Sequence, residues 1–329
     1  MRARARGKKI HYYYDAGGKP RREIPLGSDY SLAVKKWVEL QIDQPEPQGT
    51  LITFRTVAER YVREVLPGKA PRTQADNFKE LNFLYQFFDN PPALIDSIEP
   101  VHIRQYMDLR GKTAKVRANR EKALFSHIFN MARSWGLTIG TNPCAGIKGF
   151  SEVGRKDIYV EDSAFAAVYK VASQPLKDAM DLAYLTGQRP ADVLKTAETD
   201  IRECALCITQ QKTKAKLRIS IEGELADLMV RIMARKATFK VRCLALIVND
   251  DGKRLTYNML RNHFDAARDA AGVDKDSFQF RDLRAKAATD KADLSGDIRQ
   301  AQQQLGHTTV GMTEQYIRAR KGQKVTPTK

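Results

Sequence analysis

The sequence predicts a mainly α-helical protein with a small β component, arranged as a short N-terminal unit, a helical domain and a larger mixed domain. Apolar residues recur at helical spacing through most of the chain, while the alternation typical of strands is confined to two short regions. Stretches rich in proline or glycine at 43–49 and 146–156 separate the three parts. With 329 residues and 42% hydrophobic content, the chain is long enough to bury more than one core.

Residues 1–45 are predicted to form the first unit. Strand-forming residues at 10–15 and 21–26 flank a glycine-containing turn and predict a β-hairpin, and a helix is expected over 30–41. Tyrosines interleaved with basic residues indicate either a module that contacts nucleic acid or a hairpin whose tyrosines pack on its own helix. Both interpretations remain open. The candidate contacts in this unit are Arg21 and Arg22.

Residues 51–145 are predicted to form a helical domain. Four segments carry apolar residues at helical spacing, and prolines or glycines mark where they begin or end. Four short helices of this kind pack as a compact bundle. Basic side chains at the start of the fourth helix are either ordinary solvated residues or contacts that neutralise a phosphate backbone without reading bases. These candidate contacts are Lys112, Lys115, Arg117, Arg120 and Lys122.

The remainder of the chain, up to a short tail, is predicted to combine helices with one hairpin. An apolar helix ends at Gly187, which is expected to be a left-handed cap, and the chain becomes helical again after Pro190. Arg189 therefore lies at a break between two helices, where its guanidinium can project from the core. Alternation over 208–221 predicts a hairpin that carries Lys212 at its tip.

Two arginines follow a predicted amphipathic helix at 255–271, whose apolar face is expected to lie in the core. Arg281 and Arg284 are three positions apart, so on one helix they would share a face. Two fixed guanidinium groups suit the oxygens of a phosphate. The pair therefore indicates an anion-binding site.

The stretch 305–316 is predicted to bring an imidazole and a phenol together. Gly306 is expected to cap a helix, His307 to begin a tight connection, and a new short helix to start at Thr313. A phenol has a reference pKa of about 10, so Tyr316 becomes a nucleophile only where nearby cations or a base assist it. That positive charge must come from the upstream basic residues.

Taken together, six of these residues resemble the pattern of the tyrosine recombinases, the phage integrase family. That pattern is an arginine after Thr-Gly, a lysine in a β-hairpin, an H-x-x-R pair, and Leu-Gly-His with a tyrosine nine residues later. The matching residues are Arg189, Lys212, Arg281, Arg284, His307 and Tyr316. One position departs from the pattern. Arg281 stands where histidine is usual, and a guanidinium binds phosphate oxygens but cannot accept a proton.

The resemblance implies a domain organisation. It predicts a basic arm-type DNA-binding unit at 1–45, and a four-helix core-binding domain with a SAM-like fold at 51–145. A catalytic tyrosine-recombinase domain is expected at 157–320, followed by a tail at 321–329 that can reach a neighbouring protomer. The expected assembly is a homotetramer on double-stranded DNA at specific attachment sites, aided by host or phage DNA-bending proteins.

The resemblance also implies the reaction of a site-specific DNA recombinase of a phage or prophage. Tyr316 would attack a phosphodiester to form a 3′-phosphotyrosine link, and Lys212 would protonate the leaving 5′-oxygen. Arg189 and Arg284 would hold the non-bridging oxygens as charge develops. His307 would donate a hydrogen bond to the phosphate, while Arg281 would add a third guanidinium or help to position the tyrosine. Neither a metal nor any other cofactor is expected.

Two alternatives stay open beside this reading. Arg281 suggests a catalytically impaired integrase remnant that only binds DNA. A topoisomerase of type IB would use the same tyrosine chemistry to relax DNA alone.

Composition agrees with a nucleic-acid partner. Lysine and arginine total 56 against 39 acidic residues, and a net charge of +17 indicates a polyanionic ligand. Four cysteines are too few for a disulfide scaffold, and the C-x-x-C pair Cys204 and Cys207 has no second ligand pair, so no metal site is expected. A signal-like run and a long apolar segment are both missing, which predicts a cytoplasmic protein, nucleoid-associated when bound to DNA, with no membrane contact.

Overall fold

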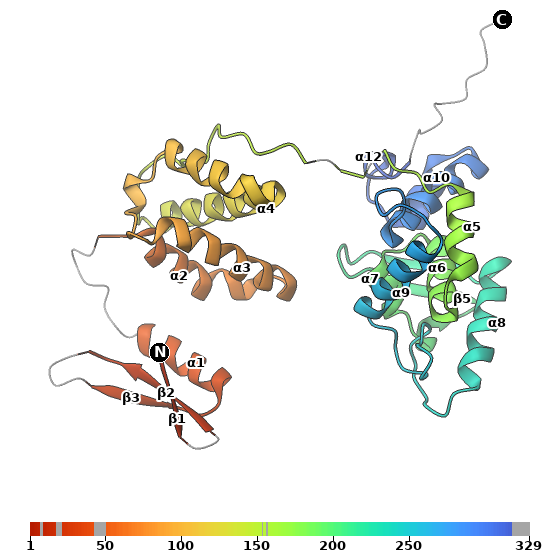
Figure 1. Ribbon diagram of the computed structural model, residues 1–329, viewed down its shortest axis with the longest axis horizontal. Coiled ribbons are helices and arrows are strands. Elements are labelled where there is room, and N and C mark those ends of the chain that lie inside the picture. The colour runs from red at the N-terminus through yellow and green to blue at the C-terminus, as the bar shows by residue number, and fades with distance from the viewer. Residues whose placement is uncertain (7–8, 18–21, 43–50, 153, 156, 318–329) are drawn as a thin grey trace, which may run out of the picture. The chain divides into compact units, whose positions relative to one another are not determined.

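The computed structural model describes residues 1–6, 9–17, 22–42, 51–152, 154–155 and 157–317. Its chain divides into two compact units, Met1–Val153 and Gly154–Lys329, and each is described by itself (Figure 1). The linker predicted at 43–49 and the tail at 321–329 lie outside the described residues. No helix of the described residues is long and apolar enough to cross a membrane.

The chain begins with a three-stranded antiparallel sheet and one helix. Strands β1 (Arg2–Arg6), β2 (Lys9–Asp15) and β3 (Glu23–Gly27) pair in that order, and helix α1 (Tyr30–Ile42) follows. The predicted hairpin and helix are confirmed, whereas β1 was not predicted because its alternating Arg-Ala sequence lacks apolar strand formers. A small core holds this part together, formed by Tyr14, Leu26 and Ala33.

The two arginines proposed as contacts of this part differ in what can be said of them. Arg22 is exposed and closes the β2–β3 connection through backbone bonds with Ala16 and Gly17. Arg21 lies outside the described residues. The buried Tyr14 packs beside α1, which supports a structural role for that tyrosine.

The predicted four-helix bundle is present in the first unit. Its four helical segments are α2 (Phe54–Glu64), α3 (Pro71–Phe88) and the two halves of α4 (Pro100–Ser134), with short 3-10 turns η1 (Leu66–Gly68) and η2 (Ile95–Ser97). The third and fourth predicted helices form the continuous α4, which is interrupted at Ala114 by non-helical backbone angles, φ −153° and ψ 68°. Stacked aromatic rings fill the centre, with 4.9 Å between the ring centroids of Phe54 and Phe125.

The five basic residues proposed on α4 fall into two groups. Lys122 donates to the carbonyl of Ile147, and Arg120 pairs with Glu152 at 3.0 Å, so both hold the segment that leaves the bundle. The other three are exposed and keep their proposed role as phosphate contacts. They are Lys112, Lys115 and Arg117.

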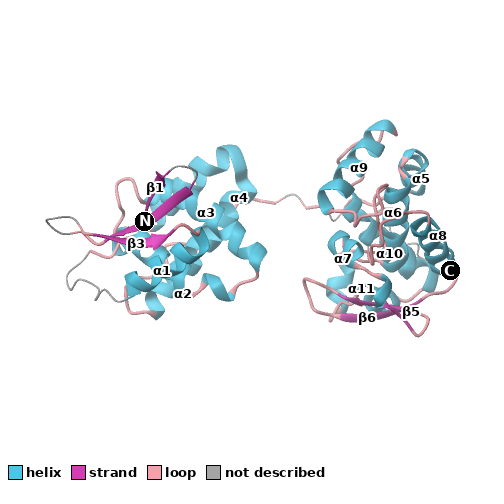
Figure 2. Ribbon diagram, turned by 90° about the horizontal axis from the view of Figure 1, so that it is seen from below, coloured by secondary structure: helices cyan, strands magenta, loops and turns pink. Residues whose placement is uncertain are grey.

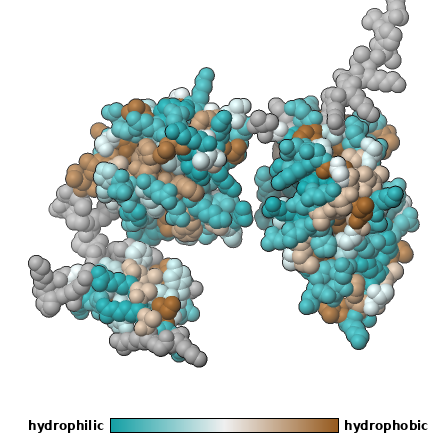
Figure 3. All heavy atoms as spheres, viewed as in Figure 1, coloured by the Kyte–Doolittle hydropathy of each residue, from teal (hydrophilic) through white to brown (hydrophobic). Residues whose placement is uncertain are grey.

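The second unit packs helices around α6, with a small sheet on one side (Figure 2). Strands β4 (Ile201–Arg202), β5 (Ala205–Thr209) and β6 (Lys216–Ser220) are antiparallel in that order. Hydrophilic side chains cover much of the visible surface (Figure 3). The remaining elements are α5 (Asp162–Val171), α6 (Gln174–Thr186), α7 (Pro190–Lys195), η3 (Glu198–Asp200), α8 (Glu224–Ala237), α9 (Tyr257–Ala270), η4 (Phe280–Asp282), α10 (Leu283–Ser295), α11 (Ile298–Leu305) and α12 (Val310–Glu314).

Polar contacts fasten the first residues of this unit to α10. Arg155 forms a bidentate pair with Asp282, with Nε–Oδ1 and Nη2–Oδ2 distances of 3.1 and 2.6 Å. Lys286, only 3% exposed, binds Asp162 and Asp290. The carboxylate of Asp290 also accepts hydrogen bonds from the hydroxyls of Tyr159 and Tyr184. The segment that enters the unit is therefore bound to the helix that carries Arg284.

Two local predictions were wrong. Arg281 belongs to η4, which the Asp282 carboxylate closes by accepting from the backbone N–H of Gln279 at 2.8 Å, and α10 begins only afterwards. Arg281 is therefore exposed while Arg284 is buried, and the two do not share a helix face. The last helix begins at Val310 rather than Thr313, and Tyr316 lies just beyond its end.

Candidate active site

Arg189 is fixed by the break between α6 and α7. It lies at the predicted break between two helices, as the N-cap residue of α7, and Gly187 before it has the left-handed φ of 66°. Its Nη1 donates to Oε1 of Gln210 at 2.9 Å and lies 4.0 Å from Oδ2 of Asp192. The guanidinium thus points toward the end of strand β5.

Gln210 connects four segments and was not predicted. Its side chain is fully buried, and its Nε2 donates to Oε1 of Gln188 and to the carbonyl of Leu305, both at 2.8 Å. Its Oε1 also accepts from Thr213 in the hairpin turn, at 2.6 Å. A glutamine next to the predicted hairpin tip was the only sequence signal, and it did not reveal that the amide would be buried.

Arg284 lies at the centre of the cluster and is 3% exposed. Its Nη1 donates to the carbonyl of Gly187 at 2.6 Å, and its Nη2 to the carbonyl of Leu305 at 2.8 Å. Burial and then the charge of Arg189 lower the pKa of this guanidinium to about 10, an effect that Tyr316 partly offsets. Arg284 remains charged at neutral pH. Its Nε has no partner among the described atoms, which leaves a donor for a ligand.

His307 bridges Arg284 and α12. Its Nε2 is 3.0 Å from Nη2 of Arg284, and its Nδ1 is 3.0 Å from Oγ1 of the buried Thr313. A guanidinium only donates, so Nε2 accepts and Nδ1 carries the proton. Burial, followed by the charges of Arg284 and Arg189, lowers the pKa of His307 to about 4. The imidazole is therefore neutral at pH 7, and the Arg284 donor fixes its tautomer.

This lowered pKa predicts a pH-dependent stability. Because His307 titrates at 6.5 when unfolded and near 4 when folded, the unfolded chain binds the extra proton between these values. Stability is full above the unfolded pKa and falls as pH drops toward the folded pKa. We expect Tm to decrease by a few degrees more in the wild type than in His307→Gln between about pH 7.5 and about pH 4.5. Parallel melting curves for the two proteins would contradict this prediction.

Tyr316 joins the cluster from the same chain. Its ring centroid is 5.1 Å from that of His307 and 5.4 Å from the guanidinium carbon of Arg284. The backbone is anchored where the Tyr316 N–H donates to the carbonyl of Thr313 at 2.8 Å. The predicted proximity of His307 and Tyr316 is thus observed, and the Arg284 guanidinium provides positive charge near the Tyr316 ring.

Gly306 makes this packing possible. It ends α11 with φ 64°, a conformation that side chains rarely adopt. A Cβ there would lie 3.2 Å from Nε2 of Gln210 and from a methyl of Leu217. Glycine is therefore required for α11 to approach the hairpin while His307 enters the cluster.

Lys212 is exposed in the turn between β5 and β6, so the predicted hairpin is confirmed. The turn is tied to the cluster because the N–H of Gln211 donates to Oδ1 of Asp192 at 2.8 Å. No contact joins the Lys212 ammonium to the other candidate residues in the part of the chain described here.

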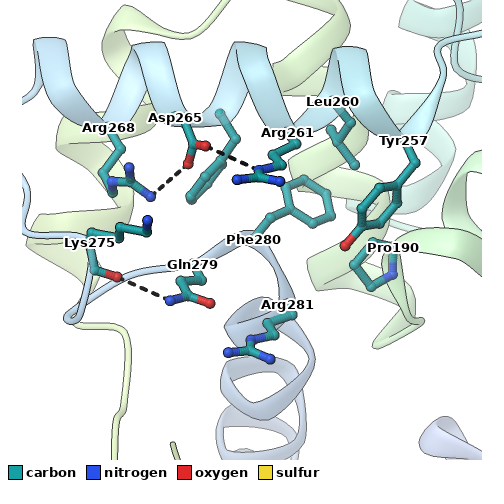
Figure 4. A pocket seen from close by; sticks show the side chains of 11 residues that line it. Pro190, Tyr257, Leu260, Arg261, Asp265, Arg268, Lys275, Gln279, Phe280 and Arg281 are labelled. Atoms are coloured by element: carbon teal, nitrogen blue, oxygen red, sulfur yellow. Dashed lines mark hydrogen bonds and ion pairs between the residues drawn. The ribbon is translucent and has the colours of Figure 1, made fainter. Parts of the chain in front are cut away.

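Arg281 lies apart from the Arg284 cluster. It lines a cavity of about 300 Å³ between α9 and η4, where Pro190 also contributes (Figure 4). No hydrogen bond or ring contact connects Arg281 to Tyr316 or His307 within the described ranges. Its neighbour in the sequence, Asp282, closes η4 and pairs with Arg155.

The arrangement is suited to an anion. Two guanidinium groups, an imidazole and a phenol come together in a partly buried site, where fixed donors stabilise developing negative charge most strongly. Groups of three or more histidine, cysteine, aspartate or glutamate side chains that could hold a metal ion do not occur among the described residues. The guanidinium donors that come together here suit the oxygens of a phosphate.

Comparison with known sequences finds integrases and a tyrosine recombinase. The model of the phage integrase family matches residues 161–323. The integrase of Escherichia phage HK022 is 26% identical over 330 residues, which covers 93% of this chain and 90% of that protein. The integrase of Enterobacteria phage 434 is 29% identical with the same coverage. The tyrosine recombinase XerD of Corynebacterium glutamicum is 30% identical over 140 residues, 42% of this chain and 46% of XerD.

Solved structures share the fold. A lambda integrase dimer bound to a COC′ core site has a TM-score of 0.73 at 20% identity, covering 99% of this chain and 97% of that one. A lambda integrase tetramer bound to a Holliday junction also has a TM-score of 0.73. The Tn1549 transposon integrase in complex with a circular intermediate DNA has a TM-score of 0.68 at 13% identity, covering 82% of this chain and 95% of that one.

Proposed function

Because this chain belongs to the phage integrase family of tyrosine recombinases, we propose that it is a site-specific DNA recombinase that acts through a 3′-phosphotyrosine intermediate. The observation that carries the proposal is the position of the Tyr316 ring, 5.4 Å from the guanidinium carbon of Arg284 and 5.1 Å from the ring of His307, within one chain. A tyrosine, an arginine and a neutral imidazole in that arrangement serve attack on a phosphodiester.

The residues have separate roles in the proposed reaction. The phenol oxygen of Tyr316 forms a bond to phosphorus as the bond from phosphorus to the 5′-oxygen breaks, and the phenolic proton leaves to solvent. Arg189 and Arg284 stabilise the charge that develops on the non-bridging oxygens. Lys212, from the hairpin turn, gives its proton to the leaving 5′-oxygen. The 5′-hydroxyl of a partner strand later reverses the step.

His307 must change its hydrogen bond when phosphate binds. In the structure its Nε2 accepts from Arg284, so it has no proton to donate there. A phosphate oxygen that takes over this Arg284 donor releases Nε2, and a proton moved from Nδ1 to Nε2 would let the imidazole donate to the same phosphate. Thr313 can then donate its hydroxyl to Nδ1.

The assembly is proposed from the structural relatives. Lambda integrase has been crystallised as a tetramer bound to a Holliday junction. We expect this chain to form a homotetramer on paired double-stranded attachment sites, with host or phage DNA-bending proteins assisting. The reaction would take place on DNA in the cytoplasm, in association with the nucleoid.

A covalent capture experiment tests the function. A pool of nicked duplexes of random sequence lets the 5′-hydroxyl fragment diffuse away after attack, which traps the protein on DNA. We expect the wild-type protein to capture DNA without added metal or ATP, and the recovered peptide to carry the nucleotide on Tyr316. Failure to capture any DNA would favour the remnant that only binds DNA. Capture without resolution of a synthetic Holliday junction would favour the topoisomerase alternative.

Replacement of Arg281 by histidine is predicted to be tolerated. Since Arg281 lies outside the Arg284 cluster, and histidine is the residue typical of the family there, Arg281→His is expected to keep or raise the rate of covalent capture at saturating DNA. The measurement is the single-turnover rate on a captured sequence, with Arg299→His on the exposed face of α11 as control. A loss of rate of about tenfold or more would show that Arg281 contacts the scissile phosphate directly.

A further inference from the structure

The cavity between α9 and η4 has a form that the proposed reaction does not use. One face of α9 lines one side, and η4 with the preceding loop lines the other. Buried apolar side chains form the floor, where the rings of Phe264 and Phe280 meet edge to face at 5.7 Å. The lining residues that decide its chemistry are Arg261, Phe264, Asp265, Arg268, Lys275 and Arg281. We call this cavity the α9–η4 pocket.

The charges in the α9–η4 pocket do not cancel. Asp265 is the one carboxylate among its lining residues, and it serves two guanidinium groups. Its Oδ1 is 2.9 Å from Nη1 of Arg268, and its Oδ2 is 3.6 Å from Nε of Arg261 (Figure 4). Arg268 is 4% exposed, also pairs with Asp269 at 3.2 Å, and keeps a buried Nε that has no partner among the described atoms.

Two more cations lie at the exposed edge of the pocket. Lys275 and Arg281 are both exposed, and neither forms an ion pair with any residue that the structure describes. Figure 4 shows Lys275 near Arg268 and Arg281 on η4 below the cavity. The pocket therefore has an open, positively charged rim over an apolar floor, which suits the phosphate and sugar of a nucleotide.

The α9–η4 pocket is lined by residues close in sequence to the candidate phosphate ligands, which indicates what kind of anion it binds. Pro190 follows the candidate phosphate ligand Arg189, and Arg281 is three positions before Arg284. A strand bound at the Arg284 cluster carries a phosphate at every nucleotide, so its next phosphates lie close to the first.

We propose that the α9–η4 pocket holds one backbone phosphate of the DNA strand next to the scissile phosphodiester, with Lys275 and Arg281 as its direct cationic contacts. This inference rests on the proposed function. It gives Arg281 a task in binding rather than in proton transfer, which explains how an arginine can occupy this position. Asp265 pairs with Arg261 and Arg268 and so partly neutralises their charge. Lys275 and Arg281 at the rim are left to bind the phosphate.

The first test is the salt dependence of DNA binding. A duplex selected from a random pool for tight binding to the Tyr316→Phe protein serves as probe, so that no cleavage is needed. Lys275→Ala and Arg281→Ala are each expected to weaken binding about tenfold at moderate salt. Because both contact one phosphate, the double variant should lower the slope of log K against log salt by about one, not two. Lys240→Ala, an exposed lysine outside the pocket, is the matched control.

The second test locates the phosphate. Single neutral methylphosphonates are placed along the same duplex. One position near the cleavage site should cost the wild type about tenfold in affinity and cost the Lys275→Ala, Arg281→Ala double variant nothing. Variants that bind like Lys240→Ala, or a double variant that stays sensitive at every position, would overturn the proposal. Binding of inorganic phosphate with no such DNA position would also overturn it. These outcomes are independent of covalent capture, whose failure would refute the recombinase function alone.

Discussion

Tyr316→Phe is expected to abolish covalent capture of DNA while DNA affinity stays within about twofold of the wild type. The phenol oxygen is the proposed nucleophile, and loss of a nucleophile commonly reduces rates by factors of about a thousand or more. Phenylalanine keeps the ring that packs 5.1 Å from His307, so the fold around it should persist. The measurement is the yield of protein–DNA adduct on a nicked duplex, alongside binding to the uncut duplex.

A matched control is available on α5. Tyr169 is a half-buried tyrosine whose hydroxyl donates to Asp181 at 2.7 Å, and it has no contact with the candidate residues in the described ranges. Tyr169→Phe should capture DNA at the wild-type rate. Adduct formation by Tyr316→Phe would mean that another side chain is the nucleophile, and the proposed mechanism would be wrong.

Arg284→Ala should produce the second large effect, because it removes both a phosphate ligand and a structural centre. Loss of one fixed donor to a developing oxyanion lowers rates by about 100- to 1,000-fold. The same change leaves the carbonyl of Gly187 without its buried donor, and we expect unfolding to become easier by about 3 kcal/mol. Single-turnover capture and thermal melting measure the two effects separately.

Arg284→Lys separates chemistry from folding. A lysine retains the positive charge but cannot reach Gly187, Leu305 and a phosphate together from one planar group, so capture should stay at least about tenfold below wild type even where Tm recovers. Arg299→Ala on the exposed side of α11 should change neither quantity. Equal capture by Arg284→Ala and Arg299→Ala would remove Arg284 from the active site.

The proposed nucleophile Tyr316 and the proposed phosphate ligand Arg284 lie close together within one chain, which predicts that each subunit supplies both. The Tyr316 ring lies 5.4 Å from the guanidinium carbon of Arg284 and 5.1 Å from the ring of His307 in the same chain. Mixing Tyr316→Phe with Arg284→Ala should therefore fail to restore capture. Restored capture would show that tyrosine is delivered to a neighbouring active site.

The local features of the site could be predicted because they depend on short-range geometry. The glycine caps at 187 and 306 and the hairpin around Lys212 follow from backbone preferences within a few residues. Gln210 could not be predicted in the same way. Its side-chain amide forms hydrogen bonds with Arg189, Gln188 and the carbonyl of Leu305. Contacts between segments this far apart in the sequence cannot be inferred from residue spacing.

The two wrong local predictions near the site both concern the residue at which a helix begins. Spacing placed Arg281 and Arg284 on one helical face, but the Asp282 carboxylate binds the Gln279 N–H and delays the start of α10. Thr313 lies inside α12, which begins at Val310, and its buried hydroxyl contacts His307. Helix ends are where local propensity is weakest, and tertiary bonds decide them.

The clamp between Arg155 and Asp282 sets a limit on how this protein can be shortened. A fragment starting at residue 157 would remove Arg155 and leave the Asp282 side chain, 8% exposed in the intact protein, as a carboxylate without its cation. Removal of one partner from such a buried ion pair lowers the free energy of unfolding by about 3 kcal/mol. A fragment starting at Gly154 should consequently melt at a higher temperature and resist proteolysis longer than one starting at 157, even though both contain every residue proposed for catalysis.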